Sequence, residues 1–344
     1  MKRIYITVDT ECHDINWQDR YIWGKTRNGE LWGLDKILSL AKELSVPINF
    51  FVDVPEAKQY GDAFTKSIID KIHEAGQKAY IHLHPNYITG EEEQTFFWQY
   101  NDEEKKAILS ETKTIAERFL SESEMKVFRI GRYGADPQMY DAIRETLGEG
   151  VIDFSYCYNS SKMCHVDEQD VKTKNGVTNY KGGVLFPNTR YIGFRFKGKS
   201  KTFNLDTAET TFGEFKAIID QNKLESITLT MHSWNFIKVF FFNKTRVWAD
   251  HAAESKFRKM VRYAQEKGYV FSDIADSRTD IVPAKEDQVI DLCESPKGKV
   301  KAIIANFIRF QHTARLTKKY FILYTIFYTA LALIAGGLLF KILS

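Results

Sequence analysis

Residues 2–14 read KRIYITVDTECHD, and this stretch decides which fold is expected. Its first half alternates as a strand does, while its end gathers the acids Asp9 and Glu11. In an extended segment residues i and i+2 point to the same face, so these carboxylates would repel each other. A metal ion, an arginine or a shared proton would offset the repulsion; the alternative is a strand end that turns into solvent. His13 and Asp14, which follow, are expected in a solvated loop.

Strand-like and helix-like segments alternate along the rest of the chain. Such alternation predicts a parallel sheet with crossover helices. Seven or eight strands favour a barrel or a partly open barrel over a flat sheet, and in such folds the functional residues collect at the carboxyl ends of the strands. The expected strands are IYITVD, PINFFVDV, KAYIHLH, KVFRIG, VIDFSYCY, SITLTMHSW and YVFSDI, and the expected helices include residues 64–75, 102–120, 137–147, 211–221 and 249–267.

The pattern divides the chain into three parts. Residues 1–275 form the expected α/β domain, with an insertion at about 158–206 that is rich in Gly, Asn, Lys and aromatic residues. Residues 276–318 are expected to form a linker and a basic juxtamembrane helix, and residues 319–344 a C-terminal transmembrane anchor. The stretch FILYTIFYTALALIAGGLLF, residues 321–340, is uncharged and would span about 30 Å as a helix. A buried core helix is the alternative.

The charges around the expected anchor predict its orientation. Basic residues crowd the segment before residue 320, and only Lys341 follows the apolar run. The positive-inside rule then places the catalytic domain in the cytoplasm, as part of a single-pass protein of the inner (cytoplasmic) membrane. The basic segment from Lys297 to Lys319 would contact anionic membrane lipid. The apolar run at the N-terminus is too short for a secretory signal.

Composition excludes some classes of partner. The chain has 48 Lys+Arg and 45 Asp+Glu, a net charge of +3, which gives no sign of nucleic-acid binding. Its four cysteines show no C-x-x-C spacing, so reduced thiols are expected. Aromatic residues make up 14% of the chain, which favours a well-packed interior or sugar-binding surfaces over disorder.

A histidine pair follows the same spacing as the acid pair. His82 and His84 lie at the end of an expected strand and offer two imidazoles to one ion. Zinc and similar divalent metals accept mixed nitrogen and oxygen ligands, and a catalytic site keeps one position open for water. A lone histidine is more often a core residue, but this pair at a strand end, together with the acid pair at another, favours a metal site.

Two further strand ends carry chemistry-bearing side chains. His232 ends the otherwise apolar strand in TMHSWN and suits a general acid or base, although a core histidine bonded to backbone is the alternative. Arg129 is flanked by apolar residues in VFRIGRYGAD, so it is expected to point into the site and hold an ionised carboxylate. A surface salt bridge is the alternative for Arg129.

These residues resemble the polysaccharide deacetylase family, also called the NodB homology or carbohydrate esterase 4 type. The resemblance covers roughly residues 3–275 and rests on TVDTE, INFFV, HLHP, FRIGRYGA, TMHSW and EKGYVFSDI in this order. It implies a distorted (β/α) barrel of about seven parallel strands with a divalent-metal site. The sequence departs from the family where the second histidine usually lies, four residues after His82, because that position is Asn86.

The resemblance also implies roles for individual residues. Glu11, His82 and His84 would be the metal ligands, as in members with Asp-x-Glu and His-x-His. Asp9 would be the catalytic base, and Arg129 would orient it. In the same scheme the backbone N–H near Tyr133 would help to bind the oxyanion, His232 would protonate the leaving amine, and Asp153 would tune that histidine.

The expected function is therefore that of a metal-dependent hydrolase which removes an N-acyl group, acetyl or formyl, from an aminosugar. Its partner would be an aminosugar-containing glycan, or a polyprenyl-linked sugar at the inner membrane surface. The divalent ion would be zinc, with cobalt, nickel or manganese as alternatives. Two other functions stay open: an inactive membrane-tethered glycan-binding or scaffold protein with the same fold, and a hydrolase of esters or of non-sugar amides.

Overall fold

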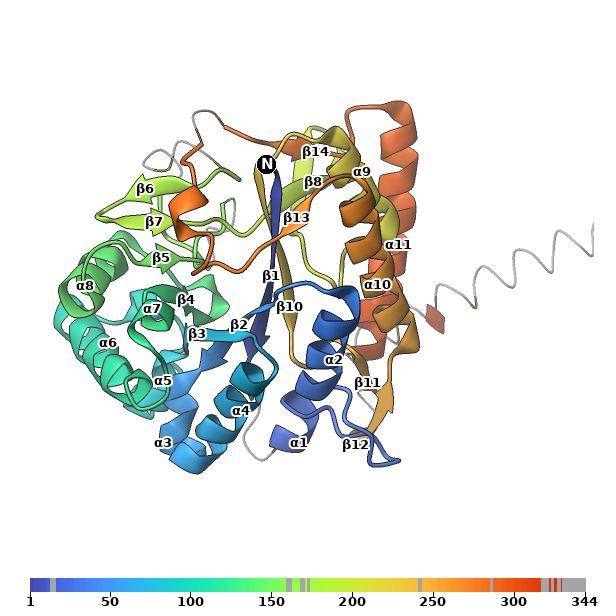
Figure 1. The fold of residues 1–344 in the computed structure, drawn as a ribbon. Coiled ribbons are helices and arrows are strands. Elements are labelled where there is room, and N and C mark those ends of the chain that lie inside the picture. Colours follow the sequence, from blue (N-terminus) through green and yellow to red (C-terminus); the bar gives the residue numbers. More distant parts are fainter. Residues whose placement is uncertain are drawn as a thin grey trace, which may run out of the picture.

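A curled sheet of nine strands forms the centre of the protein, which is described here by a computed structural model (Figure 1). The structure describes residues 1–12, 17–158, 163–167, 171, 174–240, 243–284, 287–316, 322, 325, 326 and 329. The sheet has the order β10 (Ser226–His232), β1 (Arg3–Thr10), β2 (Asn49–Asp53), β3 (Lys78–Leu83), β4 (Val127–Ile130), β5 (Ile152–Asp153), β7 (Gly183–Leu185) and β6 (Thr178–Tyr180), and β13 (Val270–Phe271) also pairs with β1. Only β6 runs antiparallel to its neighbour.

Helices surround this sheet (Figure 1). The predicted helices all form with small shifts at their ends, and α8 begins and ends as expected because Asp136 caps it and Gly148 follows it. The helices are α1 (Gln18–Tyr21), α2 (Leu34–Leu44), α3 (Ala57–Tyr60), α4 (Asp62–Glu74), α5 (Pro85–Thr89), α6 (Asp102–Ala116), α7 (Glu122–Met125), α8 (Pro137–Leu147), α9 (Phe212–Gln221), α10 (His251–Glu266) and α11 (Pro296–Leu316), with the 3-10 turns η1 (Val54–Glu56), η2 (Phe97–Gln99), η3 (Gly131–Tyr133) and η4 (Arg278–Asp280).

Two small sheets lie beside the main one. One is the antiparallel pair β11 (Ile237–Phe240) and β12 (Asn243–Ala249), and the other has the order β14 (Ile290–Asp291), β8 (Arg190–Phe196), β9 (Lys199–Asn204). The insertion predicted at 158–206 thus contains four strands, of which β7 joins the main sheet in parallel with β5. Part of the insertion therefore belongs to the barrel itself.

Side-chain alternation separates two apolar layers along the strands. Ile4, Ile6 and Val8 of β1 lie in the larger cluster, which faces the helices, whereas Tyr5 belongs to a second cluster on the inner face of the sheet. This inner cluster is mostly aromatic and fully buried; its rings are Tyr5, Phe51, Tyr80, Phe154 and Phe186. These side chains form a closely packed apolar layer, and the polar residues at the carboxyl ends of the strands lie next to it.

Irregular backbone connects the two edges of the curled sheet. Asn188 N–H donates to the Tyr156 carbonyl at 3.0 Å, beyond the end of β5. On the other side, Leu205 N–H donates to the Thr189 carbonyl at 2.7 Å, and Thr230 N–H of β10 donates to the Leu205 carbonyl at 3.0 Å. Residues near 188 and 205 thus complete the wall between β7 and β10 without a regular strand, which fits the expected distorted barrel.

The parallel register brings polar residues to one level. Asp9 of β1 is paired with His232 of β10, and His82 of β3 is paired with both Asp53 of β2 and Arg129 of β4. Neighbours in register on parallel strands point to the same face of a sheet. Five strands therefore deliver these side chains to a single place at the carboxyl end of the barrel.

The C-terminal prediction requires a correction. Within the described residues no helix is both long and apolar enough to cross a bilayer. Helix α11 carries basic residues along its length, among them Lys299, Lys301 and Arg309, which a bilayer core would not accept. The predicted single-pass transmembrane anchor, and with it the inner-membrane localisation, is therefore wrong by this finding. Most of the apolar run 321–340 lies outside the described residues.

Candidate metal and catalytic site

Three ligand-type side chains converge at the carboxyl end of β1 and β3. Glu11 Oε2 lies 2.6 Å from His84 Nε2 and 3.0 Å from His82 Nε2. One ligand atom from each residue falls within 4.8 Å of the others, and this is a group that could hold a metal ion. The predicted metal ligands Glu11, His82 and His84 are thus brought together from the ends of β1 and β3, the two strands that flank β2.

The electrostatic surroundings of Glu11, His82 and His84 favour the binding of a cation. Burial alone would raise the pKa of Glu11, but the neighbouring His84 and His82 hold it well below its usual range. Burial opposes the charged form of His82, yet the carboxylates of Asp9 and Glu11 raise its pKa. Two nitrogens and one carboxylate at nearly full burial are a donor set that zinc and related divalent ions accept.

A backbone carbonyl orients the His82 ring, and a glycine leaves room for the His84 ring. His82 Nδ1 lies 3.0 Å from the Arg129 carbonyl, so the ring donates there and turns Nε2 toward Glu11. His84 N–H donates to Asp53 Oδ1 at 3.3 Å. A Cβ added at Gly131 would lie 2.5 Å from His84 Nε2, so only glycine leaves room for this ring. Sequence reasoning missed Asp53 and Gly131, although the glycine directly after the strand KVFRI was a signal for close approach.

Asp9 and Arg129 form a fully buried ion pair on the inner face of the barrel. Arg129 Nη1 bonds Asp9 Oδ1, while Nη2 donates to Thr7 Oγ1 at 2.9 Å. The guanidinium also lies over the Phe51 ring, 4.3 Å from its centroid. The structure therefore places Arg129 inside the site, where it holds Asp9 in one orientation, and excludes the alternative of a surface salt bridge.

Asn188 is a further residue of this network that sequence reasoning missed. Its side-chain amide donates to the Phe154 and Tyr156 carbonyls at 2.8 and 3.2 Å. Its oxygen lies 3.5 Å from Arg129 Nη2 and 3.4 Å from Thr230 Oγ1. No local sequence signal marks this role, because it depends on the wall segment meeting two distant strands.

His232 lies on the opposite side of Glu11 from the two other histidines. Its Nε2 is 4.0 Å from Glu11 Oε1, and its side chain is 32% exposed, so it can reach a molecule bound above the ion site. The ring stacks on Trp234 with centroids 4.5 Å apart and planes at 26°. Asn235 Oδ1 accepts the His232 N–H at 3.2 Å, which fixes the turn that follows β10.

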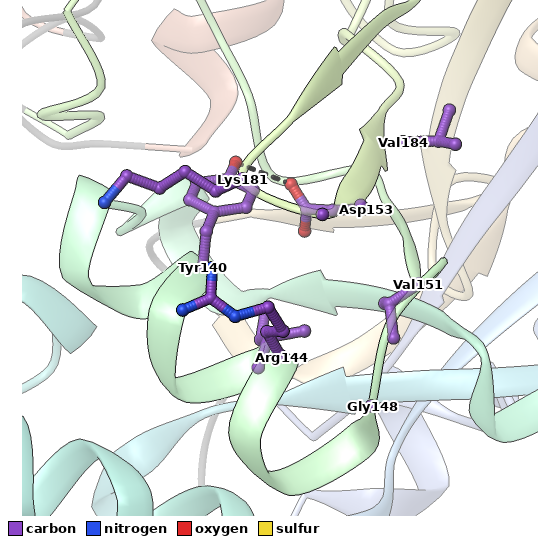
Figure 2. A pocket seen from close by; sticks show the side chains of 10 residues that line it. Tyr140, Arg144, Gly148, Val151, Asp153, Lys181 and Val184 are labelled. Atoms are coloured by element: carbon purple, nitrogen blue, oxygen red, sulfur yellow. Dashed lines mark hydrogen bonds between the residues drawn. The ribbon is translucent and has the colours of Figure 1, made fainter.

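Tyr133 and Asp153 differ in their relation to this site. Tyr133 ends the η3 turn after β4 with a φ of 55°, directly after Arg132 at 57°, so the chain bends sharply beside His84 and Gly131. Asp153 is in register with Phe128, on the outer face of β4, not with Arg129. Its carboxylate accepts the Tyr140 hydroxyl of α8 at 2.7 Å, and Figure 2 shows this bond. The structure therefore does not bring Asp153 to His232.

Two other features of the sequence bear on the site. Asn86, which stands where a second histidine was expected, has a buried side-chain oxygen with no hydrogen-bond partner among the described residues. It is not one of the three residues whose ligand atoms converge. His13 and Asp14, expected in a solvated loop, lie outside the described residues.

Comparison with known proteins identifies the fold. No family model and no curated protein matches the sequence. A solved structure from Mycobacterium smegmatis, assigned to the polysaccharide deacetylases, aligns with 81% of this chain and 90% of its own at 14% identity and a TM-score of 0.52. The chain has the polysaccharide deacetylase fold. The resemblance found in the sequence motifs is thus confirmed at the level of fold.

Other structures with the polysaccharide deacetylase fold align less closely. The alignment with a family 4 carbohydrate esterase pseudoenzyme from Bacillus anthracis spans 84% of this chain and 69% of the pseudoenzyme, at 12% identity and a TM-score of 0.43. The alignment with a family 4 carbohydrate esterase from Streptomyces lividans, in complex with acetate, spans 83% of this chain and 98% of the esterase, at 12% identity and a TM-score of 0.41.

Proposed function

We propose that this protein is a metal-dependent hydrolase that removes an N-acyl group, acetyl or formyl, from an aminosugar within a glycan. The observation that carries the proposal is the convergence of the Glu11 carboxylate with the Nε2 atoms of His82 and His84 at 2.6–3.0 Å. Beside it lie a buried Asp9–Arg129 pair and the more exposed His232. The fold, the donor set and the acid–base residues support the same class of reaction.

The donor set favours zinc, and cobalt, nickel or manganese are the alternatives. Glu11, His82 and His84 would hold the ion. When bound, a divalent ion would polarise the amide carbonyl and lower the pKa of a water molecule toward about 7. Three groups that could each bind a proton or a metal share one buried space, which supports a cation as their common partner.

The residues around the ion site divide the proton transfers between them. Asp9 is held in one orientation by its bond to Arg129, and it would accept a proton from the attacking water. His232, on the far side of Glu11, is placed to give a proton to the leaving amine. An amide needs both groups, because its carbonyl is a weak electrophile and its amine a poor leaving group. The Tyr133 N–H, at the bend after β4, would donate to the oxyanion.

Metal analysis and an amine-release assay on acetylated and formylated aminosugars test the proposal. The wild type should hold one divalent ion per chain and release amine, whereas Asp9→Asn should keep the ion and lose roughly 100- to 10,000-fold in kcat. Glu11→Gln should lose stoichiometric metal. His251→Gln alters an exposed histidine outside the site and should match the wild type. Wild-type protein that holds metal but releases no amine from any aminosugar would overturn the proposal.

The same assays distinguish the other candidates. An inactive glycan-binding protein would bind a glycan without amine release, and the unusual Asn86 is the observation that favours it. A hydrolase of esters or non-sugar amides would turn over those substrates in preference to aminosugars. A lipid-linked precursor is not retained as the expected substrate, because that expectation depended on the membrane anchor.

A further inference from the structure

The carboxylate of Asp153 accepts three hydrogen bonds on the outer face of the barrel. Its side chain is almost fully buried, and Oδ2 accepts the Tyr140 hydroxyl at 2.7 Å and the Ser155 N–H at 3.1 Å (Figure 2). Oδ1 accepts the Ser155 hydroxyl. Three donors thus meet two oxygens, an arrangement that fits the ionised carboxylate and leaves little room for a proton of its own. The adjoining cavity of about 10 Å³ holds at most one water molecule.

Ser155 transmits this arrangement to strand β4. Its hydroxyl gives its only proton to Asp153, so a lone pair is left to accept the Ile130 N–H at 2.8 Å. Ser155 is fully buried, so water cannot replace this acceptor. Asp153 therefore decides which way the hydroxyl points, and the hydroxyl in turn holds the backbone of Ile130.

Ile130, the last residue of β4, lies between two residues that contact the site. Arg129, just before it, bonds Asp9, and Gly131, just after it, abuts the His84 ring. A shift of the Ile130 backbone would move both contacts together. We propose that Asp153 is a positioning residue that acts through the Ser155 hydroxyl on the end of β4, and through it on the Asp9–Arg129 pair and His84.

The charge around Asp153 supports a role of the ionised form. Burial raises its pKa to about 6, while Ser155, Tyr140 and Arg129 counteract the rise, so the group is mostly ionised at neutral pH. Other groups that face or line this region are Arg144 from α8, Lys181 between β6 and β7, and the Cys164 thiol. Lys181 is paired with Asp141 and does not bond Asp153.

Matched variants test this inference, which rests on the proposed function only for its kinetic part. Asp153→Asn and Ser155→Ala should each lower kcat by roughly 10- to 100-fold with little change in KM, because the reacting groups are misplaced while the substrate surface is intact. The double variant should be no worse than either single one. Tyr140→Phe removes a bond to the same carboxylate without touching Ser155, so it should retain most of the wild-type kcat.

Hydrogen exchange at the Ile130 amide provides a readout independent of activity. Both Asp153→Asn and Ser155→Ala should speed this exchange relative to neighbouring strand amides, and both should weaken zinc binding. Wild-type exchange at Ile130 in the two variants would overturn the inference. So would a loss of kcat in Asp153→Asn alone, since that pattern would place Asp153 on a route that bypasses Ser155. If the wild type releases no amine at all, the proposed function fails, and exchange and zinc affinity still decide the positioning role.

Discussion

At the scale of single residues, Gly131 shows how one missing methyl group shapes the site. Its backbone is not in the left-handed region, so alanine costs nothing in backbone conformation, but the new Cβ would lie 2.5 Å from His84 Nε2. Gly131→Ala should therefore push the His84 ring aside and lower the affinity for zinc by roughly 10- to 100-fold, as the loss of ligand orientation does elsewhere. Competition with a chromophoric chelator would measure this affinity.

Gly213→Ala is the matched control for that variant. An added Cβ there meets no atom within 4 Å, and the residue lies in the first turn of α9. This change should leave zinc affinity unchanged and stabilise the protein slightly, by about 0.5–1 kcal/mol. Equal zinc affinity for Gly131→Ala and the wild type would show that His84 does not need its present position to bind the ion.

At the scale of secondary-structure elements, Glu124 of α7 joins three segments. Its carboxylate accepts from Ser121 N–H and Oγ at 2.9 and 2.7 Å, from Ala79 N–H of β3 at 3.2 Å, and lies 2.7 Å from His73 Nε2 of α4. Burial alone would raise the pKa of Glu124, but Ser121 and His73 lower it below its usual value. The ionised form is thus bound more strongly in the folded protein than in the unfolded chain.

This lowered pKa gives a pH dependence of stability with a definite sign. The contribution of Glu124 is fully present above the unfolded-state pKa of about 4.3 and is lost as the pH falls through the folded-state value. Urea unfolding from pH 7 to pH 3 should therefore show Glu124→Gln less stable than the wild type at neutral pH, with the gap closing in acid. Glu122→Gln, on the exposed side of α7, is the control. A gap that stays constant down to pH 3 would contradict the assignment.

At the scale of the whole molecule, one buried ion pair joins helix α11 to the rest of the described fold. Arg309 of α11 bonds Glu214 of α9 and donates to the Tyr191 hydroxyl of β8 at 2.9 Å. Both charged side chains are less than one tenth exposed. Arg309→Met or Glu214→Gln leaves a buried partner uncompensated and should cost about 3–5 kcal/mol of unfolding free energy.

A double-mutant cycle in urea measures this contact. The double variant should lose clearly less than the sum of the two single variants, because neither charge is then left alone. The exposed pair Lys216–Asp220 on α9 is the comparison, and Lys216→Met should leave the urea midpoint close to the wild-type value. Single variants that unfold at the wild-type urea concentration would show that α11 is held by its apolar contacts alone.

Sequence pattern predicts the barrel and the gathering of Asp9, Glu11, His82, His84 and Arg129, since these side chains follow strand ends that a parallel sheet must bring to one edge. It does not predict the residues that hold these side chains in position. Asn188 acts through contacts between segments far apart in the chain, which local sequence does not encode. The glycine after KVFRI indicates a close approach, but not that the His84 ring is what approaches it. Asp153 also lies at a strand end, but register places it in line with Phe128 and thus on the outer face. Hydropathy alone predicted the anchor, and the described helices contain none that fits.

The irregular wall near Asn188, between β7 and β10, limits how the protein can be re-engineered. Barrels of this kind vary their chemistry through the loops at one end of the strands, so transplanting a loop beside the site is one route to a new substrate preference. Here Asn188, in the stretch that joins β7 to β10, also contacts the guanidinium of Arg129, which bonds Asp9. A transplanted loop would therefore have to keep an asparagine at this position. Without it, the protein would gain a new binding surface and lose the contact that helps to orient Arg129 and Asp9.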